Sequence, residues 1–314
     1  MRRGKQAALV TLLLRIGSQV IAFSAQPRLS LIAAAQTTHS ITSLTMSTGG
    51  TNLVSAKRRR YLIARHGETN FNKEGREQGT LDSPRLTLDG ISQAAGLGVY
   101  VARRQAGQSQ EENSPPISRT WCSPLTRCRQ TFAAVSGCCS SNRQHAPLPD
   151  PTIHADLREI ELCEWQGRLT QEIIEQDAEN WERFKTDPQS LRLDRGRFAP
   201  VLDMFERGRG CWKAIRADAV AGESKRDVVF IMCHGQLGQC LLLQALGMDV
   251  ENYGKSAKYM FDNAGCVEVE WEDGDECATR WRRVHPVESG WQDRPTSQEL
   301  ASLWEPPPEK YNSS

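Results

Sequence analysis

The amino-terminal part of this sequence has no acidic residue. Asp and Glu are absent before Glu68, while ten Lys or Arg residues lie within residues 1–67. The other 29 basic and 38 acidic residues give residues 68–314 a formal charge of 29 − 38 = −9. A body with this acidic excess lacks the basic surplus that is typical of a nucleic-acid-binding domain. We therefore expect a separate basic leader and a folded body that does not bind nucleic acid.

Two further absences exclude other classes of protein. The ten cysteines include no Cys-x-x-Cys pair, which argues against a zinc knuckle or a thioredoxin-type site. Arg15 interrupts the apolar run near the amino terminus, so this run is shorter than the roughly 20 residues of a transmembrane helix. We expect no stable membrane insertion and mostly buried, inert cysteines. Redox sensitivity at Cys128 or Cys233 is kept as an alternative.

The leader, residues 1–57, has the features of a targeting presequence. A positively charged start is followed by the apolar run Ala7–Leu14 and by an acid-free stretch rich in Ser and Thr. This order resembles the two-part presequences of algae with secondary plastids, and it predicts a plastid location. A mitochondrial presequence, or a disordered tail on a cytoplasmic protein, is the alternative interpretation.

The body, residues 58–285, predicts alternating strands and helices. Buried strands are indicated by the apolar runs at 61–65, 117–122 and 227–233, and an edge strand at 267–271 pairs with 279–284. Helical patterns occupy 88–104, 124–135, 169–187, 200–219 and 237–246, and Thr87 is placed to cap the first. Residues 70–86 are expected to form a loop at the site. This order predicts a three-layer α/β/α sandwich with a mostly parallel sheet, followed by an extended tail over 286–314.

Three of the predicted strands end in polar residues. The first ends at Arg65-His66-Gly67, the second at Ser123-Pro124, and the third at His234-Gly235. Carboxyl ends of parallel strands meet at one sheet edge, where α/β proteins build their sites. Arg127 lies in the first turn of the helix after the second strand, where backbone amides already favour an anion. A neutral imidazole beside fixed guanidinium groups favours attack on a phosphoryl group.

Four stretches give this pattern a family resemblance. RHGETNFN (65–72), SPLTRCRQT (123–131), LREIELCEWQG (157–167) and CHG (233–235) occur in this order within about residues 60–285. Together they resemble the histidine phosphatase superfamily, also called the phosphoglycerate mutase-like family. The resemblance implies that His66 is the phosphorylated nucleophile and that Glu159 donates a proton, with Glu161 and Glu164 as nearby alternatives. It also implies that phosphoryl oxygens and substrate contact Arg65, Asn72, Gln78, Gly79, Arg127, His234 and Gly235.

Other features of the resemblance narrow the chemistry. No metal or other cofactor is implied, since the arginines supply the positive charge. Many family members carry Gly where Cys163 stands, so we expect a displaced loop after Glu159. The second histidine segment often continues with another Gly, whereas Gln236 stands here, and this change is expected to alter substrate contacts.

The same resemblance favours a phosphatase over a mutase. The chain lacks the Arg-Phe-Thr-Gly-Trp stretch of the mutases and their longer insertion between Glu159 and His234. Residues 157–212 are most similar to plant proteins described as 2-carboxy-D-arabinitol-1-phosphatase-like. We predict a metal-independent phosphomonoesterase with a phosphohistidine intermediate, acting on a small phosphorylated metabolite that is a sugar phosphate or sugar-acid phosphate. A phosphoglycerate mutase-type phosphotransferase and a noncatalytic protein that binds phosphorylated ligands are the alternatives.

Overall fold

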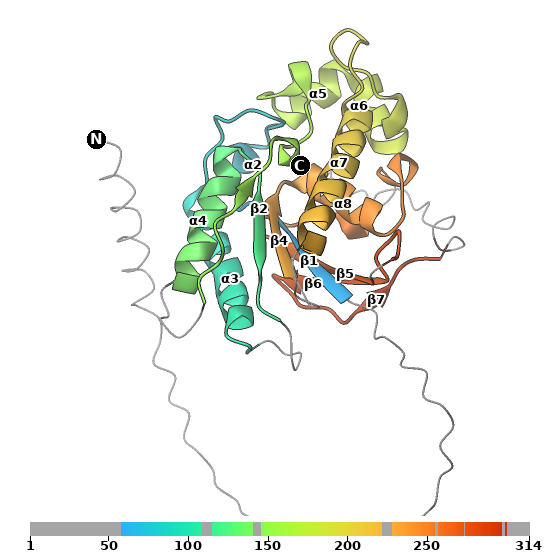
Figure 1. The fold of residues 1–314 in the computed structure, drawn as a ribbon. Coiled ribbons are helices and arrows are strands. Elements are labelled where there is room, and N and C mark those ends of the chain that lie inside the picture. The colour runs from blue at the N-terminus through green and yellow to red at the C-terminus, as the bar shows by residue number, and fades with distance from the viewer. Residues whose placement is uncertain are drawn as a thin grey trace, which may run out of the picture. The chain divides into compact units, whose positions relative to one another are not determined.

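The central element of the folded body is one mixed sheet (Figure 1). The structure, a computed structural model, describes residues 58–108, 115–140, 146–221, 228–254, 257–272, 274–296 and 299, so the predicted presequence over 1–57 lies outside the described residues. Within these ranges seven strands have the spatial order β3-β2-β4-β1-β5-β6-β7. They are β1 (Arg58–Arg65), β2 (Arg119–Cys122), β3 (Thr152–Ile153), β4 (Val228–Cys233), β5 (Cys266–Glu272), β6 (Arg280–His285) and β7 (Gln292–Asp293).

Helices cover both faces of this sheet. Strands β1 and β4 are apolar at successive positions, so each strand presents apolar side chains to both sides. On one face Leu62 and Phe230 pack in a cluster with α3 (Leu88–Gln105) and α4 (Thr126–Ser140). On the other face Ile63 and Ile231 pack with α7 (Pro200–Ala221) and α8 (Gly235–Ala245). The predicted α/β sandwich is confirmed (Figure 1).

The two halves of the sheet differ in strand direction. Strands β3, β2, β4 and β1 pair in parallel, whereas β1–β5, β5–β6 and β6–β7 are antiparallel. The prediction that 267–271 is an edge strand was wrong, because β5 lies between β1 and β6. Its polar face is buried by ion pairs: Arg104 Nη2 and Arg282 Nη2 lie 2.7 and 2.6 Å from the carboxylate oxygens of Glu268. Arg104 lies 164 residues before Glu268, whereas Arg282 lies 14 residues after it, on the neighbouring strand β6.

The predicted extended tail begins as part of the sheet. Strand β7 lies within the predicted tail, residues 286–314, and pairs with β6. The indole of Trp291 lies over the guanidinium groups of Arg280 and Arg282, at 4.2 and 4.5 Å from the ring centroid. Cation–π contacts of this kind favour docking of a short edge segment that has no apolar alternation of its own.

Short helices lie beyond the carboxyl ends of the parallel strands (Figure 1). The predicted helix over 169–187 is two helices, α5 (Thr170–Gln176) and α6 (Ala178–Thr186), which separate at Asp177. The Asp177 carboxylate accepts a hydrogen bond of 2.9 Å from the indole Nε1 of buried Trp165, which fixes the break. The predicted loop 70–86 begins with a helix, α2 (Asn70–Glu74). Single 3₁₀ turns are η1 (Ala155–Leu157), η2 (Cys163–Trp165), η3 (Pro188–Ser190), η4 (Val250–Asn252) and η5 (Ala257–Tyr259).

Candidate active site

Three strand ends bring the predicted site residues to one edge of the sheet. The register pairs Arg65 of β1 with Cys233 of β4, and Cys122 of β2 with Met232 of β4. The residues that follow these strands are therefore neighbours. The imidazole rings of His66 and His234 lie 5.3 Å apart, measured between ring centroids. The sequence-based prediction that these strand ends meet is confirmed.

His66 is held with one ring nitrogen available. The ring is buried, and its Nδ1 lies 2.8 Å from the carbonyl oxygen of Gly67. Because a carbonyl only accepts, Nδ1 carries the proton and Nε2 keeps its lone pair. Burial lowers the pKa of His66 well below its ordinary value, and the charges of Arg127 and Arg65 lower it further. A neutral imidazole with a free Nε2 is the form that attacks as a nucleophile.

The turn after His66 leaves no room for a side chain. A Cβ atom on Gly67 would lie 2.3 Å from the carbonyl oxygen of Gly90 in the first turn of α3. The Gly67 amide donates to the hydroxyl of Thr131 at 3.1 Å. The glycine therefore lets β1 end directly against α3 and α4, which fixes the position of the His66 ring.

His234 is the second buried imidazole, and Ser123 orients it. Its Nε2 lies 2.7 Å from Ser123 Oγ, which also accepts the Leu125 amide at 3.3 Å. Burial lowers the pKa of His234 well below its ordinary value, with Arg127 and His66 adding to the effect. Sequence reasoning assigned no role to Ser123. Its place directly after a buried strand, like that of His66 and His234, was the signal that could have found it.

Arg127 is a buried cation without a carboxylate partner. Its side chain is fully buried, and its two terminal nitrogens donate to the carbonyl oxygens of Leu81 and Gly79, each at 2.7 Å. Its Nε has no hydrogen-bond partner among the described residues, and no described acidic group lies within salt-bridge distance. Burial lowers the pKa of Arg127, a shift that the nearby Cys128 and Glu159 oppose. A buried charge of this kind calls for an anionic ligand.

Gly79 allows the loop to approach Arg127. Its φ of +49° lies in the left-handed region, and a Cβ atom would meet Gln166 Oε1 at 2.1 Å. Gln166 also accepts the Thr80 amide at 2.5 Å. The loop carrying Gln78 and Gly79 is therefore held by contacts with Arg127 on one side and with Gln166, in the segment after Glu159, on the other.

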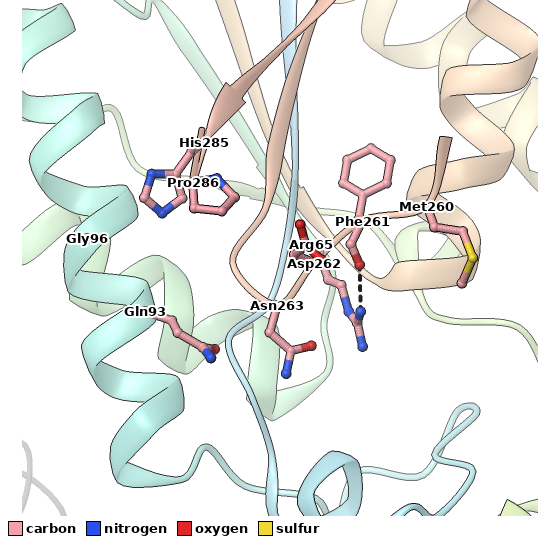
Figure 2. Close-up of a pocket in the computed structure, with 9 residues that line it drawn as sticks. All are labelled: Arg65, Gln93, Gly96, Met260, Phe261, Asp262, Asn263, His285 and Pro286. Carbon is pink, nitrogen blue, oxygen red and sulfur yellow. Dashed lines mark hydrogen bonds between the residues drawn. The ribbon is translucent and has the colours of Figure 1, made fainter. Parts of the chain in front are cut away.

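Arg65 lies on the other side of His66. One of its terminal nitrogens donates to the carbonyl oxygen of Phe261 at 2.6 Å (Figure 2). A Cβ atom on Gly235 would lie 3.2 Å from Arg65 Nε, so the start of α8 approaches this guanidinium closely. Gly235 was predicted to contact substrate. The structure brings it beside Arg65.

Glu159 is anchored at the start of α8. Its carboxylate accepts the amides of Ile160 and Leu237, both at 2.9 Å, and that of Gln236 at 3.1 Å. The two other carboxylates considered as proton donors bind other groups. Glu161 accepts hydrogen bonds from the Thr80 hydroxyl and the Cys163 amide, and Glu164 accepts one from the Asp194 amide. Of the three carboxylates, Glu159 is the one bonded to the helix that follows His234. The geometry thus favours Glu159 as the acidic group of the site.

A second carboxyl group, Glu77, was missed by sequence reasoning. Burial raises the pKa of Glu77, the hydroxyl of Thr170 opposes this shift, and the charge of Glu159 adds to it. Thr170 donates to Glu77 at 2.8 Å. Next to it, the amide oxygen of Gln78 accepts from Thr69 at 3.0 Å.

Asn72 is tied to the same loop by its amide oxygen. This oxygen accepts the Thr69 amide at 3.1 Å, and the Asn72 backbone amide donates to Thr69 Oγ1 at 3.1 Å, which together form a capping box at the start of α2. The side-chain nitrogen Nδ2 of Asn72 forms no hydrogen bond with the rest of the described chain. It is the group that could donate to a ligand, as the resemblance implies.

The cysteines near the site are buried thiols. Cys128 Sγ donates to the carbonyl oxygen of Cys233 at 3.0 Å and lies 3.4 Å from His234 Nε2. Burial raises the pKa of both thiols well above the ordinary value, so the reactive thiolate is disfavoured. Cys163 has a φ of +44°, the conformation that a glycine would adopt. The backbone at Cys163 thus has the left-handed turn, and the expected displacement of its loop relative to other family members stays a prediction.

The described residues contain neither a metal-ligand cluster nor a helix suited to span a membrane. No cluster of three or more His, Cys, Asp or Glu side chains there is arranged to bind a metal ion. None of the helices described has the length and apolar character that a membrane span needs.

The two buried histidines predict a loss of stability in acid. Both pKa values lie below the ordinary 6.5 when the protein is folded, so the unfolded chain binds more protons below that pH. Their contribution to stability is present above about pH 6.5 and decreases as the pH falls, by up to ~1.4 kcal/mol per pH unit for each histidine. Urea unfolding between pH 7.5 and 5 should show this decline. His66→Gln should reduce the slope, and an equal slope in the variant would contradict the assignment.

Comparisons with known proteins agree with this geometry. The profile of the histidine phosphatase superfamily (branch 1) matches residues 61–283. A probable 2-carboxy-D-arabinitol-1-phosphatase from Arabidopsis thaliana is 33% identical over 195 residues, covering 62% of this chain and 35% of the plant protein. A 2-carboxy-D-arabinitol-1-phosphatase from Triticum aestivum is 28% identical over 198 residues, covering 63% and 34%. The chain spans about a third of the length of these relatives.

A solved structure shares the fold. The native structure of a mycobacterial glucosyl-3-phosphoglycerate phosphatase matches 72% of this chain and 97% of its own with a TM-score of 0.55, at 23% sequence identity. Because the family profile covers most of the chain and includes both histidines and both arginines of the site, this chain belongs to the histidine phosphatase superfamily (branch 1).

Proposed function

We propose that residues 58–285 form a metal-independent phosphomonoesterase that acts through a phosphohistidine on His66. The observation that carries this proposal is the buried, carboxylate-free guanidinium of Arg127 beside two neutral buried imidazoles. A phosphate monoester supplies the anion that this cation lacks, and Nε2 of His66 supplies the nucleophile.

The first step transfers the phosphoryl group to the enzyme. Nε2 of His66 attacks phosphorus, the phosphorus–nitrogen bond forms, and the bond to the alcohol oxygen breaks. Arg65, Arg127 and neutral His234 donate to the three phosphoryl oxygens, where the transition state carries its charge, and Asn72 adds a donor. Since the cations come from arginine, the proposed step needs no metal ion.

Glu159 is proposed to give its proton to the leaving oxygen. Three amide donors hold its carboxyl group in one orientation at the start of α8. In the second step water attacks phosphorus, the phosphorus–nitrogen bond breaks, and Glu159 takes a proton from the water. Inorganic phosphate then leaves, and His66 returns to its neutral form.

The proposed substrate is the phosphate of a sugar or a sugar acid. This class is supported by the names of the plant relatives, which act on a sugar-acid phosphate, although the chain spans about a third of their length. The proposed location is the plastid. It rests on the basic, acid-free leader over residues 1–57 and on the origin of these relatives in plants, which contain plastids.

The test is hydrolysis of p-nitrophenyl phosphate by the full chain in the presence of EDTA. We expect turnover, and we expect mass spectrometry of rapidly quenched protein to find phosphate on the His66 peptide in an acid-labile bond. Turnover that EDTA abolishes would contradict metal independence. Turnover that needs a bisphosphorylated primer would indicate the mutase reaction, and phosphate binding without turnover would indicate a noncatalytic binding protein.

A further inference from the structure

A large cavity lies beside Arg65, outside the ring of groups proposed to hold the phosphoryl group. Its volume is about 790 Å³, within the range of small-molecule sites. It lies where the first turns of α3, the loop before β5 and the end of β6 meet (Figure 2). The Arg65 guanidinium borders it, so the cavity adjoins the phosphate site.

Three polar side chains of the cavity wall have donor or acceptor groups that form no hydrogen bond within the described ranges. The Gln93 amide oxygen accepts the Glu68 amide at 2.8 Å, while its nitrogen has no described partner. The side chains of Asn263 and His285 form no hydrogen bond with other residues in the described ranges. Figure 2 shows Gln93 and Asn263 on neighbouring walls of the space, with His285 above Gln93. Such convergent, unsaturated polar groups are typical of a binding pocket.

The chemistry of the wall suits hydroxyl groups. A primary amide both donates and accepts, and so does a neutral imidazole; burial lowers the pKa of His285, which favours that neutral form. Sugar hydroxyl groups also donate and accept. The wall therefore matches a polyol better than it matches a purely apolar or purely anionic ligand.

The charges of the wall argue against a second phosphate. Arg65 is the cation that lines the cavity, and it is already proposed to bind the reacting phosphoryl group. Asp262, an exposed carboxylate, also lines the cavity, beside Arg65 in Figure 2. The nearby Arg283 donates to the carbonyl oxygens of Lys258 and Met260 and does not line the cavity. A second anionic group there would lack a countercharge.

We infer that this cavity binds the uncharged, polyhydroxylated part of a sugar or polyol monophosphate, and that Gln93, Asn263 and His285 select it. The inference rests on the proposed phosphatase reaction at His66. Of the two proposed classes it selects the sugar phosphates over the sugar-acid phosphates, that is, monophosphates with a neutral hydroxylated leaving group, and it names the residues that recognise them.

A glycine on the wall permits a test that spares the phosphate site. Gly96 lies in α3, and a Cβ atom there would meet only the His285 ring, at 3.5 Å. Leucine at this position would extend into the cavity, while its higher helix propensity supports folding. Gly210 in α7 is the matched control, because a Cβ atom there meets nothing within 4 Å.

The experiment compares kcat/KM of full-length wild type, Gly96→Leu, Asn263→Ala and Gly210→Leu. The substrates are p-nitrophenyl phosphate and the best substrate among ribose 5-phosphate, fructose 6-phosphate and sorbitol 6-phosphate. The ratio of kcat/KM for the sugar phosphate to that for p-nitrophenyl phosphate should fall at least tenfold in Gly96→Leu and severalfold in Asn263→Ala. It should keep its wild-type value in Gly210→Leu. Fructose 1,6-bisphosphate should be a poorer substrate than fructose 6-phosphate.

The outcomes separate the two proposals. No hydrolysis of p-nitrophenyl phosphate by the wild type would overturn the phosphatase reaction itself. Hydrolysis with an unchanged ratio in both Gly96→Leu and Asn263→Ala would overturn the cavity assignment and leave the reaction intact. A preference for fructose 1,6-bisphosphate would also overturn it, because the cavity offers a second phosphate no cation of its own.

Discussion

Replacing His66 with alanine is expected to lower kcat for p-nitrophenyl phosphate by at least about 10⁴-fold, a loss on the scale seen when an enzymatic nucleophile is removed. The imidazole keeps a lone pair on Nε2, because Nδ1 is committed to the Gly67 carbonyl oxygen. Without Nε2 no phosphoenzyme forms, and the remaining donors can only stabilise a slow direct attack by water. Steady-state kinetics and the quenched phosphoenzyme assay both measure this.

The control must separate chemistry from folding. His154→Ala removes another imidazole, one that accepts the Asp156 amide and lies beside Trp121. His154 follows β3, which β2 and β4 separate from the strand β1 that carries His66. We expect near wild-type kcat in this variant. Substitution of His66 leaves the Gly67 carbonyl oxygen without its donor, so urea unfolding should show a modest loss of about 1–3 kcal/mol. A folded His66→Ala protein that keeps a tenth of wild-type kcat would contradict the phosphohistidine mechanism.

The strand ends of the site could be predicted from sequence because the signal is local. An apolar run that stops at Arg65-His66-Gly67 or at His234-Gly235 shows where the strand ends, and parallel pairing then brings the ends together. The helix start that carries Arg127 follows from the same logic, although α4 begins at Thr126, two residues after Pro124. Each of these inferences depends only on residues within one strand and the turn that follows it.

The features that sequence reasoning missed depend on partners that are far apart in the chain. Glu268 is buried because Arg104, 164 residues earlier, pairs with it. No local sequence pattern predicts such a pair. The break between α5 and α6 depends on the Asp177 carboxylate reaching Trp165. Strands β3 and β7 have two residues each, too few to show an alternation. Ser123 orients His234 across 111 positions.

Arg127→Lys is expected to lower kcat by about 10²–10³-fold, although it keeps the positive charge. The guanidinium spans two carbonyl oxygens, those of Gly79 and Leu81, and still has N–H groups to offer a phosphoryl oxygen. An ammonium group is a single point of charge on a different stem, and it cannot reproduce that fork. One or both carbonyls would lose their donor, so the loop that carries Gln78 would shift as well.

Three measurements test this dual role of Arg127. Alongside kcat, the inhibition constant of orthovanadate should rise in parallel with the kcat loss, because both report contacts to the phosphoryl site. The free energy of unfolding should fall by about 1–3 kcal/mol, the cost of leaving a buried carbonyl group unsatisfied. Arg129→Lys is the matched control, since Arg129 lies on the same helix and is exposed. A variant at 127 that loses stability but keeps wild-type kcat and vanadate inhibition would show that Arg127 only supports the loop. The buried cation would then no longer support a phosphate site.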